Sequence, residues 1–567
     1  MIRTGGRRAR SGAVAVAVVG ALVLAGACSS DDGGGAAEGS SDGTTPVVAE
    51  PAGLAVLGPP DAEGPPQDGG NVVFGVEAEP DGLDPTRSAF DTSGHLMASA
   101  VFDPLVEIDD EGQAVPYLAE SIEPDDDFTE WVITLRDGVT FHDGTALDAD
   151  ALALNLQFWQ ESFITAPSLA AVSGYEVTGP LEVTVTTSQP WVTFPYSLAG
   201  QTSYVAAPSF LENPLQDGPP MNPVGTGPFR LADRDAYVPG ESFWVVRYDD
   251  YWQEGLPHLD GIRFDFTPDA LERVSAIESG AADLIHGYNP VILDQARADA
   301  EAGDLKVVSN GTGEEDVIAL NAERPPFDDP VARQALSHAT DASAWRAEAE
   351  SPADGQDHEV RSPWVEGQLG YTADDGYRAY DPEAAAQLAD EYEATHGEPI
   401  RFELVSTTLV ADQALSQILI DQWAEVGIEA SIVTMPLSEL VVTTVLGEFQ
   451  AVNWRNFGAP DPDADYLWWH SSGIVPSPRI STNVARFADD EIDAALDAAR
   501  AVEEPAERDA QYQAVARRLN EGAAYVWLGR PTWVVAAVPR VQGLAAAQTT
   551  MATLGPKTWL ADLWVSG

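Results

Sequence analysis

Cys28 is the only cysteine in this chain of 567 residues. Disulfide bonds within the chain and cysteine metal clusters are therefore excluded as sources of stability. A chain of this length allows about three domains of ordinary size, and it can bury large apolar cores. Hydrophobic residues make up 44% of the chain and charged residues 21%, which is the composition of a globular protein. The fold must therefore depend on packed cores.

Acidic residues dominate the charge. There are 91 Asp and Glu against 29 Lys and Arg, which gives a formal net charge of −62. Attraction to nucleic-acid phosphates needs clustered cations, so this composition excludes a nucleic acid as partner through the general field of the protein. A charge of this size bears on solubility and on association with other molecules, and it does not select a fold.

The amino terminus has the three parts of a secretory signal. Residues 1–10 carry four arginines and no acid, residues 11–24 are apolar, and Ala25-Gly26-Ala27 precedes Cys28. This pattern predicts a signal peptide over residues 1–27, and the apolar stretch is too short for a comfortable membrane span. The placement of Cys28 resembles a bacterial lipobox, which implies lipidation of Cys28 as the first mature residue. The alternative is a plain secretory signal with an incidental cysteine.

Residues 28–70 are rich in Gly, Pro, Ser and Asp and contain no Lys or Arg. No apolar periodicity occurs there, so we expect a disordered tether. No later stretch has eighteen uninterrupted apolar residues, so no second membrane segment is predicted. Together with a lipidated Cys28, this predicts an extracytoplasmic protein anchored to the outer face of the cell membrane by lipid alone.

From Asn71 onward the hydrophobic pattern changes repeatedly between the period of a strand and that of a helix. Strands are predicted over residues 71–76, 129–135, 181–186 and 428–433. Helices are predicted after the capping residues Asp148 and Asp489, from Pro505, and over residues 411–426 with Gly427 as the terminating glycine. No repeat with a period of 20–50 residues is present. The prediction is a large α/β protein with at least two lobes.

Motifs for catalysis are absent from the sequence. There is no phosphate-binding loop, no Gly-x-Ser-x-Gly elbow and no His-Glu-x-x-His. Asp461, Asp463 and Asp465 have the spacing of a calcium loop, but Tyr466 and Ser472 stand where that loop needs Gly and Glu. We therefore predict no catalytic residue, no metal and no cofactor, and we expect that the protein is not an enzyme.

An ordered series of short motifs covers nearly all of the predicted folded body. They are Leu83-Asp-Pro85, Val101-Phe-Asp-Pro-Leu105, Leu135-Arg-Asp-Gly-Val-Thr-Phe-His-Asp-Gly144, Val224-Gly-Thr-Gly-Pro-Phe229, Ser279-Gly-Ala-Ala-Asp283 and Pro325-Pro-Phe-Asp-Asp-Pro330. In this order the motifs resemble the family 5 solute-binding proteins of ABC transporters, the oligopeptide, dipeptide and nickel-type group.

The resemblance implies the two-lobed periplasmic-binding-protein fold of the large type, cluster C. The first lobe would comprise residues 71–312, with a subdomain inserted at about 104–189, and the second lobe residues 313–532, before residues 533–567 return to the first. A monomer would enclose a peptide or other polar small molecule by hinge closure. It would then deliver the molecule to a membrane permease, for which separate ATPase subunits supply energy.

The resemblance also points to a ligand-binding segment near Trp454. In peptide-binding members the Asp three residues after this Trp holds the α-ammonium of the peptide, whereas this chain has Phe457 there. A phenyl ring cannot replace that charge-assisted bond. Arg455 would suit a carboxylate, a phosphate or a polar sugar-like ligand, or else it pairs with neighbouring acids. The ligand-binding candidates are Trp454, Arg455, Asn456, Phe457, Phe90, Asp91, Arg530 and Trp533.

Three classes of function remain open at this point. The first is the solute-binding lipoprotein of an ABC importer, whose ligand could be a peptide, a sugar or a nickel chelate. The second is a secreted hydrolase, which should show one positioned nucleophile or carboxylate pair. The third is a structural or adhesive surface protein, which should show repeats. The sequence favours the first class, because it contains neither of the features expected of the other two.

Overall fold

The computed structural model describes residues 55–109, 112–213, 222–233, 236–310, 314–350, 359–458, 461–544 and 559–567. The predicted signal peptide, Cys28 and the first part of the predicted tether lie outside these residues. Among the described residues, no helix combines the length and the apolar character that crossing a membrane requires.

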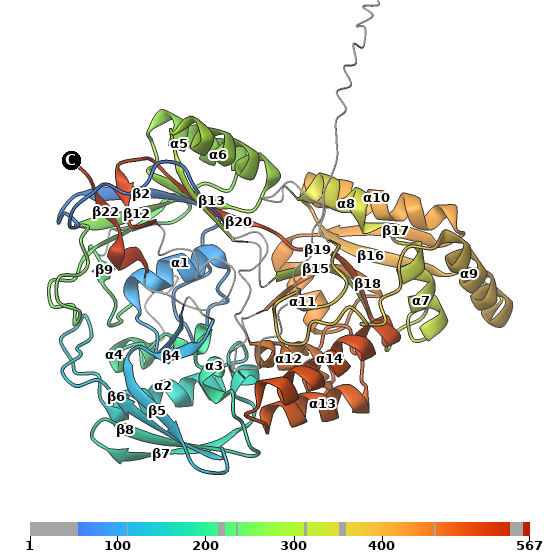
Figure 1. The fold of residues 1–567 in the computed structure, drawn as a ribbon, viewed down its shortest axis with the longest axis horizontal. Helices are drawn as coiled ribbons and strands as arrows, with labels where there is room; N and C mark the ends of the chain where they lie inside the picture. Colours follow the sequence, from blue (N-terminus) through green and yellow to red (C-terminus); the bar gives the residue numbers. More distant parts are fainter. Residues whose placement is uncertain are drawn as a thin grey trace, which may run out of the picture. The chain divides into compact units, whose positions relative to one another are not determined.

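A nine-stranded mixed sheet organises the first half of the fold and also receives the chain end (Figure 1). Strand β20 lies between β14 and β13, so a segment from beyond residue 530 completes a sheet that otherwise comes from residues 55–310. The path of the sheet is β1 (Ala55–Leu57), β14 (Lys306–Asn310), β20 (Trp533–Ala537), β13 (Leu284–Gly287), β2 (Asn71–Val76), β12 (Gly261–Phe266), β11 (Ser242–Arg247) and β10 (Tyr237–Val238), with β9 (Phe229–Leu231) beside β11.

The tether prediction is wrong for residues 55–70. Strand β1 pairs antiparallel with β14, with Ala55 opposite Ser309 and Leu57 opposite Val307. The buried ammonium of Lys306 makes an ion pair with Asp61. These contacts join distant parts of the chain, so the local Gly- and Pro-rich composition does not reveal them.

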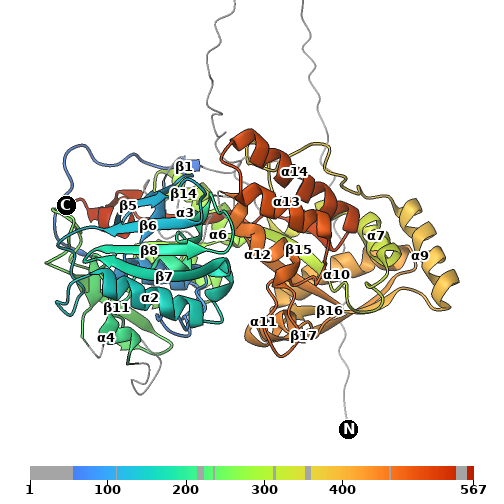
Figure 2. The ribbon, with the colours of Figure 1, turned by 90° about the horizontal axis from the view of Figure 1, so that it is seen from below.

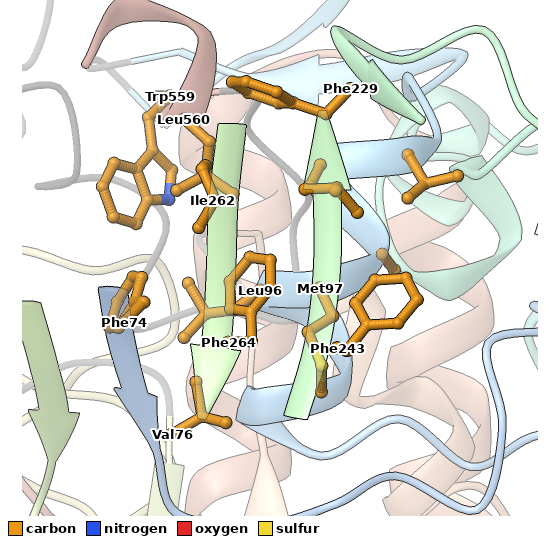
Figure 3. Close-up of a cluster of buried hydrophobic side chains, with 14 of the residues drawn as sticks. Phe74, Val76, Leu96, Met97, Phe229, Phe243, Ile262, Phe264, Trp559 and Leu560 are labelled. Atoms are coloured by element: carbon orange, nitrogen blue, oxygen red, sulfur yellow. The ribbon is translucent and has the colours of Figure 1, made fainter. Parts of the chain in front are cut away.

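Apolar side chains cover both faces of the nine-stranded sheet. On one face α1 (Thr92–Val101) packs Leu96 and Met97 over Phe243 and Phe264, and Trp559 packs edge-on against Phe74 (Figure 3). On the other face lie α5 (Ala270–Ser279) and α6 (Pro290–Ala302), which bury Ile277, Ile292 and Leu293. Because both faces are covered, the central strands are almost continuously apolar.

A separate four-stranded antiparallel sheet lies within residues 119–187 (Figure 2). Its order is β5 (Ala119–Pro124), β6 (Glu130–Leu135), β8 (Glu182–Thr187) and β7 (Val172–Gly179). Helix α2 (Ala149–Glu161) begins at its N-cap Asp148, as predicted, and buries Leu152, Leu156 and Trp159. Short elements complete this region: β3 (Val106–Ile108), β4 (Ala114–Pro116), α3 (Phe194–Ser197) and α4 (Pro208–Leu211).

The second large sheet has five strands, and β15 alone among them runs antiparallel to the others. Its order is β17 (Glu429–Met435), β16 (Arg401–Thr407), β18 (Ala451–Phe457), β15 (Glu314–Leu320) and β19 (Tyr525–Gly529). Strands β16, β17 and β18 run parallel, so their carboxyl ends lie at one edge of the sheet.

Helices cover both faces of this five-stranded sheet. One core contains Leu419 and Trp423 of α10 (Val410–Glu425), and the other contains Leu440 of α11 (Leu437–Val445) and Leu496 of α13 (Asp490–Arg500). The helices are α7 (Pro330–Ala339), α8 (Ala342–Ala349), α9 (Pro382–His396), α10 (Val410–Glu425), α11 (Leu437–Val445), α12 (Tyr466–Trp469), α13 (Asp490–Arg500) and α14 (Pro505–Gly522). A final short pair, β21 (Val541–Gln542) and β22 (Trp564–Val565), follows.

Local capping signals predicted the helix ends well. Asp489 accepts hydrogen bonds from the amides of Glu491 and Ile492 at the start of α13. Pro505 is the first residue of α14. Gly427, just after α10, has a φ of +83°, which is the left-handed conformation expected of a terminating glycine.

Gly225 and Gly227 are needed for space rather than for freedom of the backbone. A Cβ atom on Gly225 would lie 2.3 Å from the carbonyl oxygen of Val101, and one on Gly227 would lie 2.6 Å from the same oxygen. The ring of His142 bonds the carbonyl oxygen of Gly227 at 2.9 Å. These motif residues therefore have structural roles.

Candidate functional site

Three successive acids begin β15: Glu314, Glu315 and Asp316, which we call the acid triplet. The antiparallel register with β18 sets them opposite the predicted ligand-binding segment, in the pairs Glu314–Phe457, Glu315–Asn456 and Asp316–Arg455. Directly opposed residues of an antiparallel pair lie close together. The acid triplet therefore faces most of the segment that the sequence singled out.

Arg455 makes its main contacts with the acid triplet. Its Nε and Nη2 atoms donate to the two carboxylate oxygens of Asp316 at 2.8 and 3.2 Å, and Nη1 lies 3.6 Å from Glu314. The guanidinium also covers the ring of Tyr288 at 4.5 Å. A quarter of the Arg455 side chain remains exposed. The sequence left two interpretations of Arg455 open. The geometry supports the one in which Arg455 pairs with neighbouring acids.

Aromatic rings from the nine-stranded sheet continue this contact. The ring centres of Tyr288 and Trp533 lie 4.8 Å apart, and Trp533 stacks on His286 with ring centres 5.8 Å apart. The indole Nε1 of Trp533 donates to Glu314 at 3.1 Å. Burial lowers the pKa of His286 to about 3, so this ring stays neutral at physiological pH. Trp533, a ligand-binding candidate from the sequence, therefore contacts the acid triplet.

The neighbours Trp454 and Arg455 point to opposite faces of β18, because side chains alternate along a strand. Trp454 packs partly against a hydrophobic core, and its Nε1 donates to Asn456 at 3.0 Å. Asn456 is fully buried, and its Nδ2 has no hydrogen-bond partner among the described residues. Phe457 is half-buried, and its carbonyl oxygen accepts from Trp468. Of these four residues, Arg455 makes the direct contact with the acid triplet.

Arg530 is a buried structural cation. Its Nη2 atom lies 3.4 Å from Glu315 and donates to the carbonyl oxygens of Ser362 and Pro363. Only 9% of the side chain is exposed. Burial raises the pKa of Glu315 well above its usual range, although the positive charge of Arg530 acts in the opposite direction.

Phe90 and Asp91 have mainly structural roles in this arrangement. Phe90 is buried against the rings of His95 and Tyr204. Asp91 caps α1 by accepting a hydrogen bond from the amide of Gly94 at 2.7 Å. The structure does not bring Phe90 to the acid triplet. Asp91 influences this site electrostatically, because its charge raises the pKa of Glu77.

Glu77, at the end of β2, is a participant that the sequence did not reveal. Its carboxylate lies 3.6 Å from Arg273. Burial raises the pKa of Glu77 to about 7, while Arg273 and Arg455 lower it and Asp91 and Glu314 raise it further. The mutual influence of these charges places Glu77 in the same electrostatic neighbourhood as the acid triplet.

Acids outnumber arginines in this neighbourhood. The carboxyl groups are those of Glu77, Asp91, Glu314, Glu315 and Asp316, against the guanidinium groups of Arg273, Arg455 and Arg530. Burial also raises the pKa of Glu314. A raised carboxyl pKa means that nearby positive charges do not fully compensate for the burial of the ionised carboxylate. An added cation would therefore be stabilised there.

The calcium-like spacing of Asp461, Asp463 and Asp465, which we call the aspartate run, has a structural explanation. Asp461 binds Arg508 at 2.6 Å, and Asp465 accepts from the indole of Trp364 at 2.9 Å. Asp463 binds Arg500 at 2.5 Å and accepts from Trp191 at 2.7 Å. Each carboxylate thus has its own protein partner, and no group of three potential metal ligands occurs among the described residues.

The sequence analysis missed Tyr288, Glu77 and the acid triplet. The sign that could have identified the triplet was its position: three acids immediately before the apolar run Val317–Leu320, at the predicted start of the second lobe. Acids are rarely buried unless they are paired, so three acids beginning a buried strand indicate a specific environment.

Comparisons with known proteins agree on one family. The model of the bacterial extracellular solute-binding proteins, family 5, middle part, matches residues 113–475. The glutathione-binding protein GsiB of Salmonella paratyphi A is 28% identical over 509 residues, which cover 86% of this chain and 93% of that protein.

Solved structures show the same fold. The PBP AgaA of A. tumefaciens R10, in complex with agropinic acid, is 25% identical with a TM-score of 0.76 and covers 88% of this chain and 99% of its own. The periplasmic binding protein DppA of Helicobacter pylori, in complex with the peptide STSA, is 19% identical with the same TM-score and the same coverage. The predicted two-lobed periplasmic-binding-protein fold is therefore confirmed.

Proposed function

Because this chain belongs to family 5 of the bacterial extracellular solute-binding proteins, it is the extracytoplasmic solute-binding component of an ABC importer, and we propose that its ligand is a polar small molecule with a protonated amine. The relatives are substrate-binding proteins of transporters, which supports this function over a secreted hydrolase. We propose the lobe boundaries that the sequence suggested, and the pairing of β1 with β14 supports extending the first lobe back to residue 55.

The excess of carboxyl groups around Arg455 carries the proposal for the amine. Asp316 already occupies two donors of Arg455, and Glu314 lies beside a third. A ligand carboxylate would have to compete with both acids for the guanidinium. A ligand ammonium would instead supply the charge that the buried carboxyl groups lack. This replaces the anionic ligand that Arg455 alone suggested.

The names of the relatives are consistent with an amine. The Salmonella protein is named for glutathione, and the Helicobacter protein was solved with a peptide. Both molecules carry an α-amino group that is protonated at neutral pH. We propose that the partly exposed ring of Tyr288 supplies a stacking surface beside the acid triplet, since aromatic faces attract cations.

Two measurements test the proposed ligand class. Mass spectrometry of the small molecules that co-purify with the protein should identify an amine-containing compound. Calorimetry with that compound should then show that Glu314→Gln weakens binding by about 2–5 kcal/mol, the scale of a buried charge pair that loses one partner. Arg455→Ala should change binding by less than about 1 kcal/mol, the scale of an exposed pair. A large effect of Arg455→Ala with none from Glu314→Gln would restore the anionic ligand.

We further propose that the protein is a monomer that is lipidated at Cys28 and held at the outer face of the membrane. The support is the basic, apolar and small-residue pattern before the only cysteine. Cys28→Ser should move the protein from the membrane fraction to the medium or the periplasm, with the fold unchanged by circular dichroism. If the variant stays in the membrane fraction, the lipid anchor is excluded.

A further inference from the structure

Five large aliphatic side chains are exposed where two adjacent βα units leave the five-stranded sheet. The exposed fractions are 61% for Leu409, 83% for Val410, 64% for Leu437, 39% for Val441 and 55% for Val442. We call these five residues the aliphatic rim. Single exposed apolar residues are common on protein surfaces, whereas a contiguous group of this size marks an interaction site.

The register of the sheet brings the two parts of the rim together. Strands β16 and β17 pair in parallel up to Thr407 opposite Met435. Leu409 follows Thr407 by two residues, and Leu437 follows Met435 by two residues. Adjacent strands lie about 4.8 Å apart, so the two chain segments leave the sheet side by side. Helix α11, which carries Val441 and Val442, lies beside these strands in Figure 2.

Helix α11 is apolar on its outer face as well as on its inner face. Leu440 and Thr444 are buried against the second lobe, while Leu437, Val441 and Val442 are exposed. Glu439 is its only charged residue. A surface helix ordinarily has charged and polar residues opposite its core face, so three exposed aliphatic side chains on one short helix indicate a covering partner.

The rim lies at the same edge of the sheet as the candidate ligand site. Strand β18 runs parallel to β16 and ends at Phe457, so the carboxyl ends of β16, β17 and β18 lie along one edge. In open α/β sheets this is the edge where ligands bind. A partner seated on the rim would therefore sit next to the ligand-binding segment.

The charge of the chain decides which partner fits. Asp412 and Glu439, the ionisable residues in the first turns of α10 and α11, are both acidic. A second copy would bring another net charge of −62, and an anionic lipid surface would also repel the rim. The partner that remains is one with an apolar surface that carries no excess of acids. Such a partner would sit at the place where the ligand is handed over. We propose that the aliphatic rim docks on the extracytoplasmic face of the permease.

This inference rests on the proposed transport function, and the experiment separates the two. The cognate permease and ATPase subunits would be placed in nanodiscs of neutral lipid, and binding of the complete mature protein would be measured by biolayer interferometry. Val410→Ser/Leu437→Ser/Val442→Ser should weaken binding by about tenfold or more, since a few buried apolar side chains dominate such interfaces. Leu271→Ser, at an exposed leucine of α5 (62% exposed), is the matched control and should change binding by less than about twofold.

Each outcome has one meaning. If the wild-type protein does not bind the transporter at all, the proposed function fails. If the wild type and the triple variant bind equally, the docking proposal fails and the transport function stands. Sedimentation that shows a dimer lost in the triple variant would identify a second copy as the occupant, and binding to empty nanodiscs that the variant loses would identify lipid. Either result would also overturn the docking proposal.

Discussion

The aspartate run and the acid triplet use the same chemistry in two different environments. In both, consecutive or alternate acids face arginines and tryptophan indoles. In the aspartate run the pair Asp463–Arg500 is sealed, with 3% and 8% of the side chains exposed. In the acid triplet the pair Asp316–Arg455 is 15% and 25% exposed. The sealed pair serves packing, whereas the open pair remains partly accessible to solvent.

The aspartate run joins two distant parts of the chain. The guanidinium of Arg500 lies over the rings of Trp191 and Tyr466, at 4.4 and 3.5 Å. The backbone amide of Val192 donates to the carbonyl oxygen of Arg500 at 2.8 Å. The segment after the four-stranded sheet is thereby attached to α13. An ion pair sealed in this way is shielded from solvent, so it has little to offer a solute.

The largest expected effect comes from breaking the sealed pair. Asp463→Ala leaves the buried Arg500 without its carboxylate and Trp191 without its acceptor, so unfolding free energy should fall by about 3–5 kcal/mol. Urea unfolding followed by tryptophan fluorescence measures this. Glu429→Ala, which breaks the exposed pair with Arg401, is the control and should cost less than about 1 kcal/mol. Equal losses for the two variants would contradict the distinction by burial.

Protonation offers a second, intermediate test. Burial raises the pKa of Asp465 in the aspartate run and of Glu77 near the acid triplet, each to about 7. The folded state then holds protons that the unfolded chain has already released. The contribution of these two groups to stability is therefore greatest below the ordinary carboxyl pKa of about 4 and is lost as pH rises through about 7.

Amide substitutions should remove this dependence. Asp465→Asn keeps an acceptor for Trp364 and should be more stable than the wild type by roughly 1–3 kcal/mol at pH 8, with little difference at pH 4. Glu77→Gln should show a smaller gain, because 22% of the Glu77 side chain is exposed and water can solvate its charge. Unfolding curves at several pH values measure both. A wild-type stability that rises from pH 5 to pH 8 relative to both variants would contradict the raised pKa values.

Local signals in the sequence predicted much of the fold, and long-range pairing limited the rest. Asp148, Asp489 and Pro505 begin helices because capping depends on a few neighbouring residues. The insertion of β20 between β14 and β13 joins segments more than 200 residues apart, and no local pattern encodes such a register. The family resemblance, rather than periodicity, supplied the return of the chain end to the first lobe.

The candidate site, like the fold, could be predicted only in part from the sequence. The resemblance led to Arg455 and Trp533, which the structure places beside Glu314. Phe90 looked equally suitable in the sequence and is instead a core residue. Whether an arginine meets a ligand or a carboxylate depends on the strand opposite, and the sequence near Arg455 contains no sign that Asp316 pairs with it.

The smallest expected effect comes from the open pair. Arg455→Met keeps an apolar stem to cover Tyr288 and removes the charge opposite Asp316. Because Asp316 and Arg455 are both partly exposed, water can replace much of the lost interaction, and unfolding free energy should fall by no more than about 1 kcal/mol. Arg500→Met is the matched variant at the sealed pair and should cost several times more. A loss at Arg455 as large as that at Arg500 would mean that the acid triplet is also a structural pair, and the ligand site would then have to be sought elsewhere along the edge that ends at Phe457.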